Sequence, residues 1–109
     1  MEFKELINRA KQIKEVNTKL AQNEGSKPWS VTERTQGFVG DVGDLVKLVM
    51  AKNGYRKYVD LDRRLAHELA DCLWSIIIIA DELEVDLEGA FWQTMNEIEQ
   101  RLVKDKNQR

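Results

Sequence analysis

The sequence predicts an all-α protein, a four-helix bundle-type chain that assembles as a homodimer or a higher oligomer. Apolar residues recur at helical spacing over most of its 109 residues, only one residue is proline, and aromatic residues make up 7%. The composition, 42% hydrophobic and 33% charged, is typical of a globular protein rather than a disordered one. A chain of this length is expected to form one domain, here residues 1–109.

The first two helices are predicted from an apolar stripe and a capping pattern. The first helix should end near Glu24, and the single proline lies in the predicted loop 26–29. Ser30 and Glu33 have the spacing of a capping box, which predicts the start of a second helix that continues to about Lys52. The core positions of this second helix are predicted to be Phe38, Val42, Leu45 and Val49.

The third and fourth helices follow after short predicted loops. Asp60 or Asp62 is expected to cap the third helix, which should run to about Glu84, and Asp86 is expected to cap the fourth. The tail after Lys104 is polar, and we expect it to be frayed. The apolar positions of the fourth helix are Leu87, Ala90, Phe91, Met95, Ile98 and Leu102.

The third helix is apolar almost all round from Leu69 to Leu83. Such a helix is buried at the centre of a fold or lies in a subunit interface. Because a small chain buries only a modest core, we expect a second copy to cover part of it, in a dimer or a tetramer. Cys72 lies within this helix and is expected to be a small buried hydrophobic residue.

Charge and composition exclude several classes of function. The net charge of −2 and the pI of about 5.5 argue against binding of nucleic-acid polymers or anionic lipid. A single cysteine excludes an internal disulfide and a cysteine-based zinc site. The N-terminus is charged throughout, and the longest apolar run, at 73–80, is far shorter than a membrane span of ~20 residues. We therefore expect a soluble, cytoplasmic protein with no membrane partner.

Two pairs of carboxylates stand out against these apolar helices. Glu68 and Asp71 are three residues apart, hence on one face of the apolar third helix, where an unpaired carboxylate is costly. Asp41 and Asp44 have the same spacing on the second helix. If the two helices pack antiparallel, the four acids converge and require a cation, and oxygen ligands favour Mg²⁺ or Mn²⁺ over zinc. The alternative interpretation is an ordinary solvated acidic surface.

Other phosphate and metal chemistries fit less well. A di-iron carboxylate bundle needs Glu-x-x-His pairs on two helices. The only histidine, His67, directly precedes Glu68, so this possibility is excluded. The chain also lacks a glycine-rich phosphate loop, so phosphate would be held by a metal ion and by cationic side chains.

The acidic segments DVGDL at 41–45 and ELAD at 68–71 resemble the motifs EExxE and ExxD of MazG-like nucleotide pyrophosphohydrolases. The resemblance covers roughly Trp29 to Leu102. It implies an Mg²⁺-dependent enzyme of the house-cleaning type that converts a nucleoside or deoxynucleoside triphosphate to the monophosphate and pyrophosphate. It also implies that the metal-binding and catalytic residues are Asp41, Asp44, Glu68 and Asp71.

The resemblance has two departures. Gly40 replaces the leading glutamate of the first motif, and both matched ligands of that motif are Asp instead of the longer Glu. On the fourth helix, Thr94 and Ile98 stand where the family has the lysine and asparagine that hold phosphate, while Arg101 matches. A site with these changes is expected to bind Mg²⁺ and to turn over slowly or not at all.

The substrate-binding candidates are two aromatic residues and three cations. The resemblance implies that Trp29 and Trp74 stack on the base, although a tryptophan on a helix is more often part of a core or an interface. Lys52, Arg56 and Arg101 are candidates for holding phosphate, with ordinary surface cations as the alternative. The further cations available for this role are Arg34, Lys47 and Lys57.

Two alternative functions stay open at this point. One is a non-catalytic or weakly active MazG-like relative that acts as a nucleotide-binding or helical interaction module, which Gly40 favours. The other concerns the substrate, because phosphoribosyl-ATP pyrophosphohydrolases share the same general form. The retained acids oppose a purely structural role, because carboxylates in an apolar helix destabilise the fold when no cation compensates them.

Overall fold

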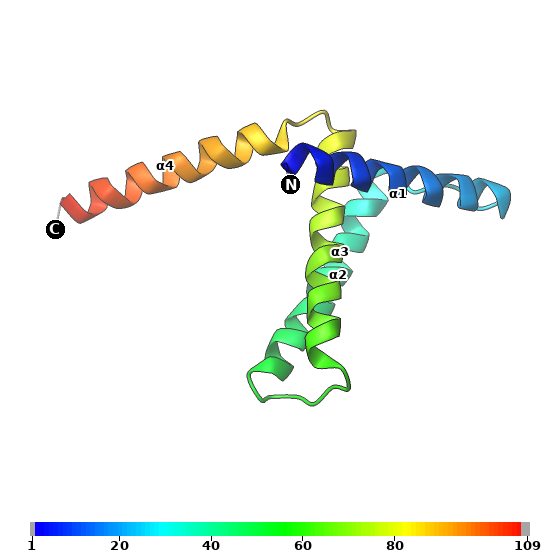
Figure 1. Ribbon diagram of the computed structural model, residues 1–109, viewed down its shortest axis with the longest axis horizontal. Helices are drawn as coiled ribbons and strands as arrows, with labels where there is room; N and C mark the ends of the chain where they lie inside the picture. Colours follow the sequence, from blue (N-terminus) through cyan, green and yellow to red (C-terminus); the bar gives the residue numbers. More distant parts are fainter. Residues whose placement is uncertain (1, 108–109) are drawn as a thin grey trace.

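This computed structural model describes residues 2–107 of the chain. The described residues form four α-helices joined by loops, and they contain no strand. The helices are α1 (Phe3–Asn23), α2 (Val31–Lys52), α3 (Leu61–Glu82) and α4 (Leu87–Asn107) (Figure 1). The predicted all-α chain with four helices is therefore confirmed. None of the described helices is both long enough and apolar enough to cross a membrane.

The helices form an open bundle arranged around α3. α2 and α3 lie side by side and run in opposite directions, as a helical hairpin (Figure 1). α1 crosses the C-terminal half of α3, and α4 leads away from the other three helices. α3 contacts each of the other helices, which agrees with its predicted central position.

The helix boundaries follow local sequence rules at most ends. The capping box is present: the Glu33 amide donates to Ser30 Oγ (3.3 Å), and the Ser30 amide donates to Glu33 Oε1 (3.1 Å). The predicted cap of α4 is also present, since the Gly89 amide donates to Asp86 Oδ1 at 3.2 Å. For α3, Asp60 is the N-cap residue, as one of the two predicted candidates, but the expected side-chain cap does not form. Asp60 occupies the N-cap position in a left-handed conformation (φ 55°) and makes no capping hydrogen bond, and Asp62 lies inside the first turn.

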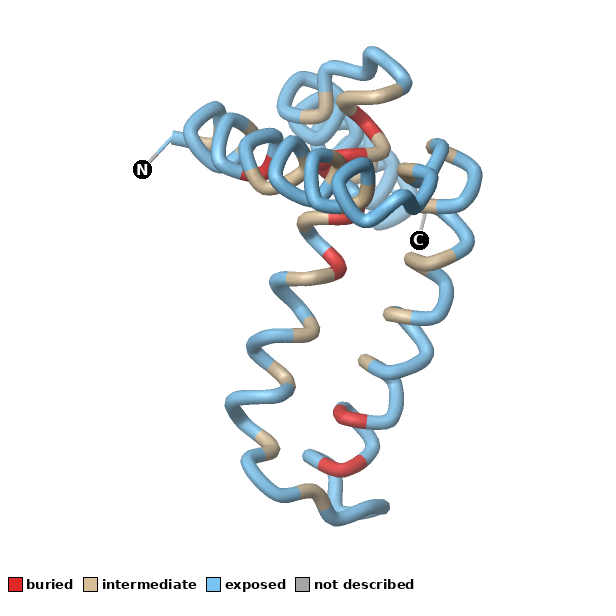
Figure 2. The backbone as a smooth tube through the Cα atoms, turned by 90° about the vertical axis from the view of Figure 1, so that its right-hand side faces the viewer, coloured by how far each residue is buried: buried red, intermediate tan, exposed pale blue. Residues whose placement is uncertain are grey.

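The main core lies where α1 crosses α3. Ala10 and two isoleucines of α3, Ile77 and Ile78, are buried, and Ile78 is fully inaccessible. The Trp74 indole packs against this cluster and its Nε1 donates to the Ala10 carbonyl at 3.1 Å. Figure 2 shows the buried positions of α3 toward the α1 end, and those of α2 toward the loop that joins α2 to α3. The middle of the hairpin lies between these two buried regions.

The inward face of α2 differs from the predicted stripe by one position. Phe38 and Leu45 face inward as predicted, but Val42 and Val49 are 37% and 44% exposed. Asp41 and Leu48 take those two places; Asp41 is partly buried and Leu48 is buried. Both sets have helical spacing, so only packing against α3 chooses between them. As a result, a carboxylate lies on the packed face of α2.

Candidate metal centre

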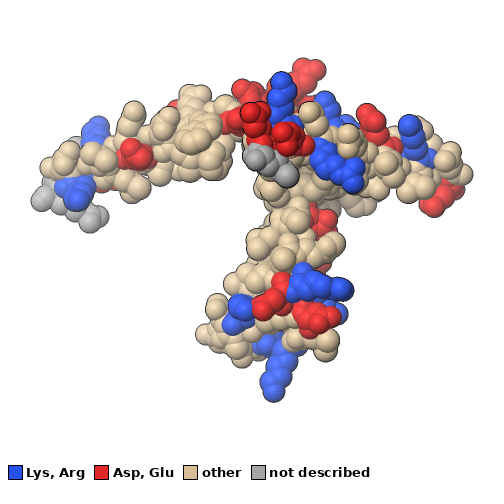
Figure 3. Space-filling model, in the orientation of Figure 1, with Lys and Arg blue, Asp and Glu red and all other residues tan. Residues whose placement is uncertain are grey.

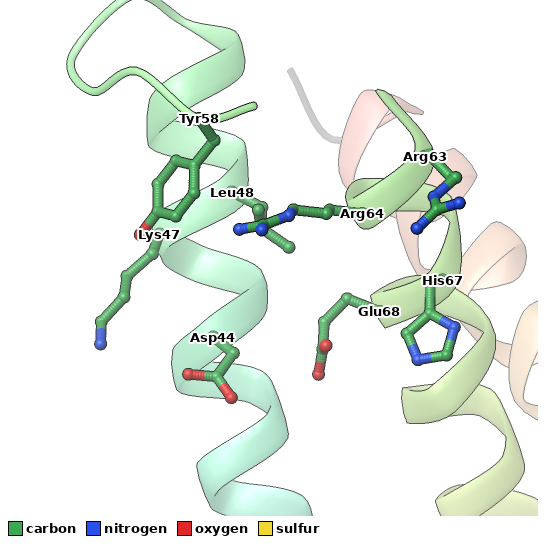
Figure 4. Close-up of a pocket in the computed structure, with 8 residues that line it drawn as sticks. All are labelled: Asp44, Lys47, Leu48, Tyr58, Arg63, Arg64, His67 and Glu68. Atoms are coloured by element: carbon green, nitrogen blue, oxygen red, sulfur yellow. The ribbon is translucent and has the colours of Figure 1, made fainter. Parts of the chain in front are cut away.

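Three carboxylates meet in the middle of the α2–α3 hairpin. Asp41 and Asp44 of α2 and Glu68 of α3 each offer one oxygen, and the three oxygens all lie within 4.8 Å of one another. Figure 4 shows Asp44 and Glu68 pointing toward one another across the space between the two helices. The antiparallel packing required by the sequence argument therefore brings acids of both motifs together.

The environment of these acids disfavours their negative charge. Partial burial, followed by repulsion from Asp71 and Asp44, raises the pKa of Asp41 above its usual value. The pKa of Glu68 is raised in the same way, by burial first and then by Asp41, Asp71 and Asp44. Within the described residues, no lysine or arginine lies within ion-pair distance of Asp41, Asp44 or Glu68. The cluster thus carries negative charge without a protein counter-ion.

Glu68 also has an unsatisfied polar atom. Its Oε1 is buried and has no hydrogen-bond partner among the residues that the structure describes. A buried carboxylate oxygen without a partner costs free energy, and such an atom in a folded protein requires an explanation. A bound cation at this point would satisfy the oxygen and offset the repulsion among the acids.

Asp71 lies beside the three-oxygen group and is not part of it. Its charge raises the pKa of both Asp41 and Glu68, so it belongs to the same electrostatic cluster. Its Oδ2 is 3.7 Å from Nε2 of His67, one turn earlier on α3, and both side chains are substantially exposed. Asp71 is therefore the acidic partner of His67 on α3.

A cavity of about 660 Å³ adjoins the acids toward the loop end of the hairpin. Asp44 and Glu68 line its acidic side, and Lys47, Arg63 and Arg64 line the remainder together with Leu48, Tyr58 and His67 (Figure 4). The Arg64 guanidinium lies 5.8 Å from the centre of the Tyr58 ring. Charged side chains of both signs gather at this end of the hairpin (Figure 3). A negative ligand with a bound cation matches this distribution of charge.

The three cations predicted for phosphate binding do not reach the cavity within one chain. Lys52 is paired with Asp62, with Nζ and Oδ1 at 2.6 Å, nearer the loop end of the hairpin. Arg56 lies in the loop between α2 and α3, and Arg101 lies on α4, which leads away from the hairpin.

Of the cations that line this cavity, Lys47 was named from the sequence, and Arg63 and Arg64 were not. Lys47 follows Asp44 by three residues and Arg64 precedes Glu68 by four, so each pair shares one helix face. That spacing is the sequence signal by which these two cations are recognisable. Arg63 has no such spacing, and only the fold brings it to the cavity.

The two predicted aromatic residues line a second hollow, of about 330 Å³, with Arg34 and Asn17. Trp29 is 56% exposed, and its ring lies so close to Gly37 that a Cβ there would be 2.6 Å from Cζ3. Trp74 also supports the core through its hydrogen bond to α1, and the Arg34 guanidinium lies 5.7 Å from its ring centre.

A third, smaller hollow joins the aromatic hollow to the acidic cluster. It shares Trp74 and Asn17 with the aromatic hollow, contains Asp71, and shares His67 with the cation-lined cavity. Neighbouring hollows therefore share lining residues along α3, from the cations past Asp71 to the two tryptophans.

No known family model, curated protein or solved structure matches this chain.

Proposed function

We propose that this protein is an Mg²⁺-dependent nucleoside triphosphate pyrophosphohydrolase, of the kind its two acidic motifs resemble. The reaction would convert a nucleoside or deoxynucleoside triphosphate to the monophosphate and pyrophosphate. The observation that carries the proposal is the meeting of three carboxylate oxygens from facing helices, next to a cavity lined by cations. A metal ion bound to a polyphosphate requires both features in the same place.

The residues fit a hard divalent cation. All three candidate ligands are carboxylates, and opposite ligands of an octahedral Mg²⁺ lie about 4.2 Å apart. The oxygens of Asp41, Asp44 and Glu68 lie within 4.8 Å of one another, so small side-chain rotations would bring all three to the distances that one Mg²⁺ ion requires. The unpartnered Glu68 Oε1 and the raised pKa values of Asp41 and Glu68 also favour a cation here. Asp71 adds a fourth negative charge beside the ligands.

The reaction requires water to add to the α-phosphorus while the bridging oxygen leaves with pyrophosphate. The cation supplies charge neutralisation of the phosphate oxygens and lowers the pKa of a bound water. Lys47, Arg63 and Arg64 would hold the charge of the leaving pyrophosphate in the cavity that they line. Most of the rate acceleration would then come from positioning and electrostatic stabilisation.

The aromatic hollow provides a place for the base. Trp29 and Trp74 line it, and it adjoins the hollow that contains Asp71. Aromatic faces bind nucleobases by stacking, at a gain of about 1–3 kcal/mol per base. A nucleotide lying along α3 would therefore place its base near the tryptophans, its α-phosphate near the acids and its terminal phosphates near the cations.

A second candidate function is metal-dependent nucleotide binding with little or no turnover. Gly40 favours it, because the leading glutamate of the acidic motif is absent from this chain. A Cβ at Gly40 would meet no heavy atom within 4 Å, so the exposed position accepts a larger side chain. Gly40→Glu is therefore a direct test. Faster pyrophosphate release in this variant would mean that the missing glutamate weakens catalysis in the wild type. Unchanged release would count against that explanation of low turnover.

Thermal unfolding with and without millimolar Mg²⁺ or Mn²⁺ tests the metal site. An ion that binds only the folded state raises the unfolding midpoint by mass action, so wild type should shift upward. Glu68→Gln should abolish the shift. Asp62→Asn is the matched control, because it removes one carboxylate from the same helix outside the cluster and should keep the shift. If none of the proteins shifts with metal, either alone or together with a non-hydrolysable nucleotide mixture, the site is not a metal centre.

Release of pyrophosphate from a panel of nucleoside triphosphates, with phosphoribosyl-ATP included, tests the reaction itself. A wild-type rate that requires Mg²⁺ and disappears in Glu68→Gln supports hydrolysis. A nucleotide-dependent rise in the unfolding midpoint without pyrophosphate release supports the binding function instead. Preference for phosphoribosyl-ATP would assign the protein to that substrate.

A further inference from the structure

α4 makes little use of its apolar face within one chain. The helix has no buried residue, and beyond its first turns it extends away from the rest of the molecule (Figure 1). Phe91 is 57% exposed and Leu102 is 62% exposed, on a stripe that also contains Leu87, Met95 and Ile98. In proteins most of the stability of a helix comes from packing of its apolar face, so the stripe of α4 requires a partner.

The dimensions of the chain also indicate that surface remains to be covered. Its radius of gyration is 17.7 Å, whereas a compact domain of this length has a value of about 13 Å. Its accessible surface is 8815 Å², against about 6,200 Å² for a compact monomer of this mass. The excess of about 2,600 Å² is of the size that each copy contributes to a large obligate dimer interface.

An apolar groove of about 590 Å³ lies at the base of α4 and adjoins the apolar stripe. Leu73 and Ile76 of α3, 43% and 39% exposed, form one side of it. Phe91 and Trp92 of α4 form the other side. The stripe and the groove are therefore parts of one continuous apolar surface, which extends from the exposed side of α3 along α4.

The sequence of α4 suits an antiparallel pair of identical helices. Glu88 lies in the first turn, Glu97 and Glu99 follow near the middle, and the C-terminal part holds Arg101, Lys104, Asp105 and Lys106. An antiparallel pairing about the centre of the apolar stripe brings Glu88 of one helix to the level of Arg101 of the other. The stripe is also symmetric about its centre, which lies between positions 94 and 95. Phe91 and Ile98 are equally far from this centre on its two sides, and so are Leu87 and Leu102.

We propose that the stripe of α4 and the adjoining groove form a two-fold interface with a second copy of this chain, in which the two α4 helices pack antiparallel. Leu102 of the second copy would then lie opposite Leu87, at the groove, and the same contact would recur at the other end. One self-complementary surface satisfies both copies, as a two-fold interface requires. This interface does not depend on the nucleotide chemistry proposed for the hairpin.

Sedimentation equilibrium of the purified chain tests the association. We expect a mass near twice 12.7 kDa, or a multiple of that value, at micromolar concentration. Met95→Glu places a charge on the stripe of both copies and should weaken association by about a hundredfold or more. Gln100→Glu adds the same charge on the opposite face of α4 and should leave the mass unchanged. A monomeric wild type, or equal weakening by both substitutions, overturns the proposal.

Cysteine cross-linking tests the orientation without relying on a destabilised variant. In a Cys72→Ser background, chains carrying Leu87→Cys and chains carrying Leu102→Cys are oxidised separately and then after mixing and exchange. The antiparallel pair predicts a disulfide-linked dimer only in the mixture. Dimers formed by each variant alone would indicate parallel helices, and no dimer in any sample would exclude contact along the stripe; either result overturns the proposed arrangement.

Discussion

Two acidic sites on α3 differ in what surrounds them. Near the C-terminal end, Glu82 contacts two cations from other helices: its Oε1 is 3.2 Å from Lys14 Nζ and 3.0 Å from Arg34 Nε. In the middle of the helix, Glu68 lies against Asp41 and Asp44, and none of the described lysines or arginines is within ion-pair distance of it. Both glutamates lie on the same helix and both are partly buried.

The difference separates a structural role from a functional one. The pairs at Glu82 tie α1 and α2 to the end of α3, and each charge there has its opposite. The cluster at Glu68 lowers the stability of the fold unless something else supplies positive charge. A protein that retains such a cluster in its most apolar helix is expected to use it for a ligand.

The largest expected effect concerns activity at the middle site. Asp41→Asn removes one of the three converging oxygens, and Mg²⁺-dependent pyrophosphate release should fall on the order of a thousandfold, or about 4 kcal/mol in the barrier. Glu82→Gln should leave the rate within a few-fold of wild type. Steady-state pyrophosphate assays check both, and equal losses in the two variants would remove the distinction between the sites.

The next effect concerns stability at the C-terminal site. Glu82→Gln leaves Arg34 without its charged partner, and Lys14 keeps only Asp81, 3.9 Å away. The Arg34 and Glu82 side chains are only 11% and 17% exposed. We expect a loss of about 2 kcal/mol in the free energy of unfolding, less than for a fully buried pair. Glu68→Gln, measured without metal, should instead increase stability. Urea unfolding measures the change in the free energy of unfolding for both variants. A change of the same sign in both would contradict the comparison.

A smaller effect is expected at Trp74, which lies between the two sites. Trp74→Phe keeps an aromatic ring beside Arg34 but removes the hydrogen bond from Nε1 to the Ala10 carbonyl. We expect a cost of about 1 kcal/mol in the free energy of unfolding. The metal-induced shift in the unfolding midpoint should stay as in wild type. Loss of that shift would mean that the core and the acidic cluster are coupled.

The smallest effect is a dependence of stability on pH in the absence of metal. The pKa values of Asp41 and Glu68 are raised in the folded state, so the folded chain holds protons that the unfolded chain has already released. Stability should therefore fall as the pH rises from the ordinary carboxyl values of 3.8 and 4.5 through the raised ones.

Urea unfolding in a chelating buffer from about pH 4 to pH 8 measures this slope. Glu68→Gln should reduce the fall, and saturating Mg²⁺ should oppose it at neutral pH. Stability that instead rises with pH across this window in wild type alone, but not in Glu68→Gln, would show that Glu68 is stabilised as the anion by the protein itself.

The helices and most of their ends were predictable from local sequence. The capping box at Ser30 and Glu33 and the cap at Asp86 depend only on residues three apart, so no tertiary information is needed. The α3 cap was not predictable in this way, because the left-handed conformation of Asp60 is set by the path of the loop rather than by the residue type. The two acidic pairs were recognisable by spacing and by the apolar character of α3.

Tertiary structure alone decided which side chains meet. Helical periodicity permits either Val42 or Asp41 on the inner face of α2, and packing against α3 selected Asp41. The same packing placed Asp71 beside the three-oxygen group rather than in it, and brought Arg63 to the cavity in place of Lys52 or Arg56. Residues three or four apart are neighbours on one helix, so the sequence alone determines these contacts. The rotation and approach of one helix against another depend on contacts between residues far apart in the chain, which only the folded structure supplies.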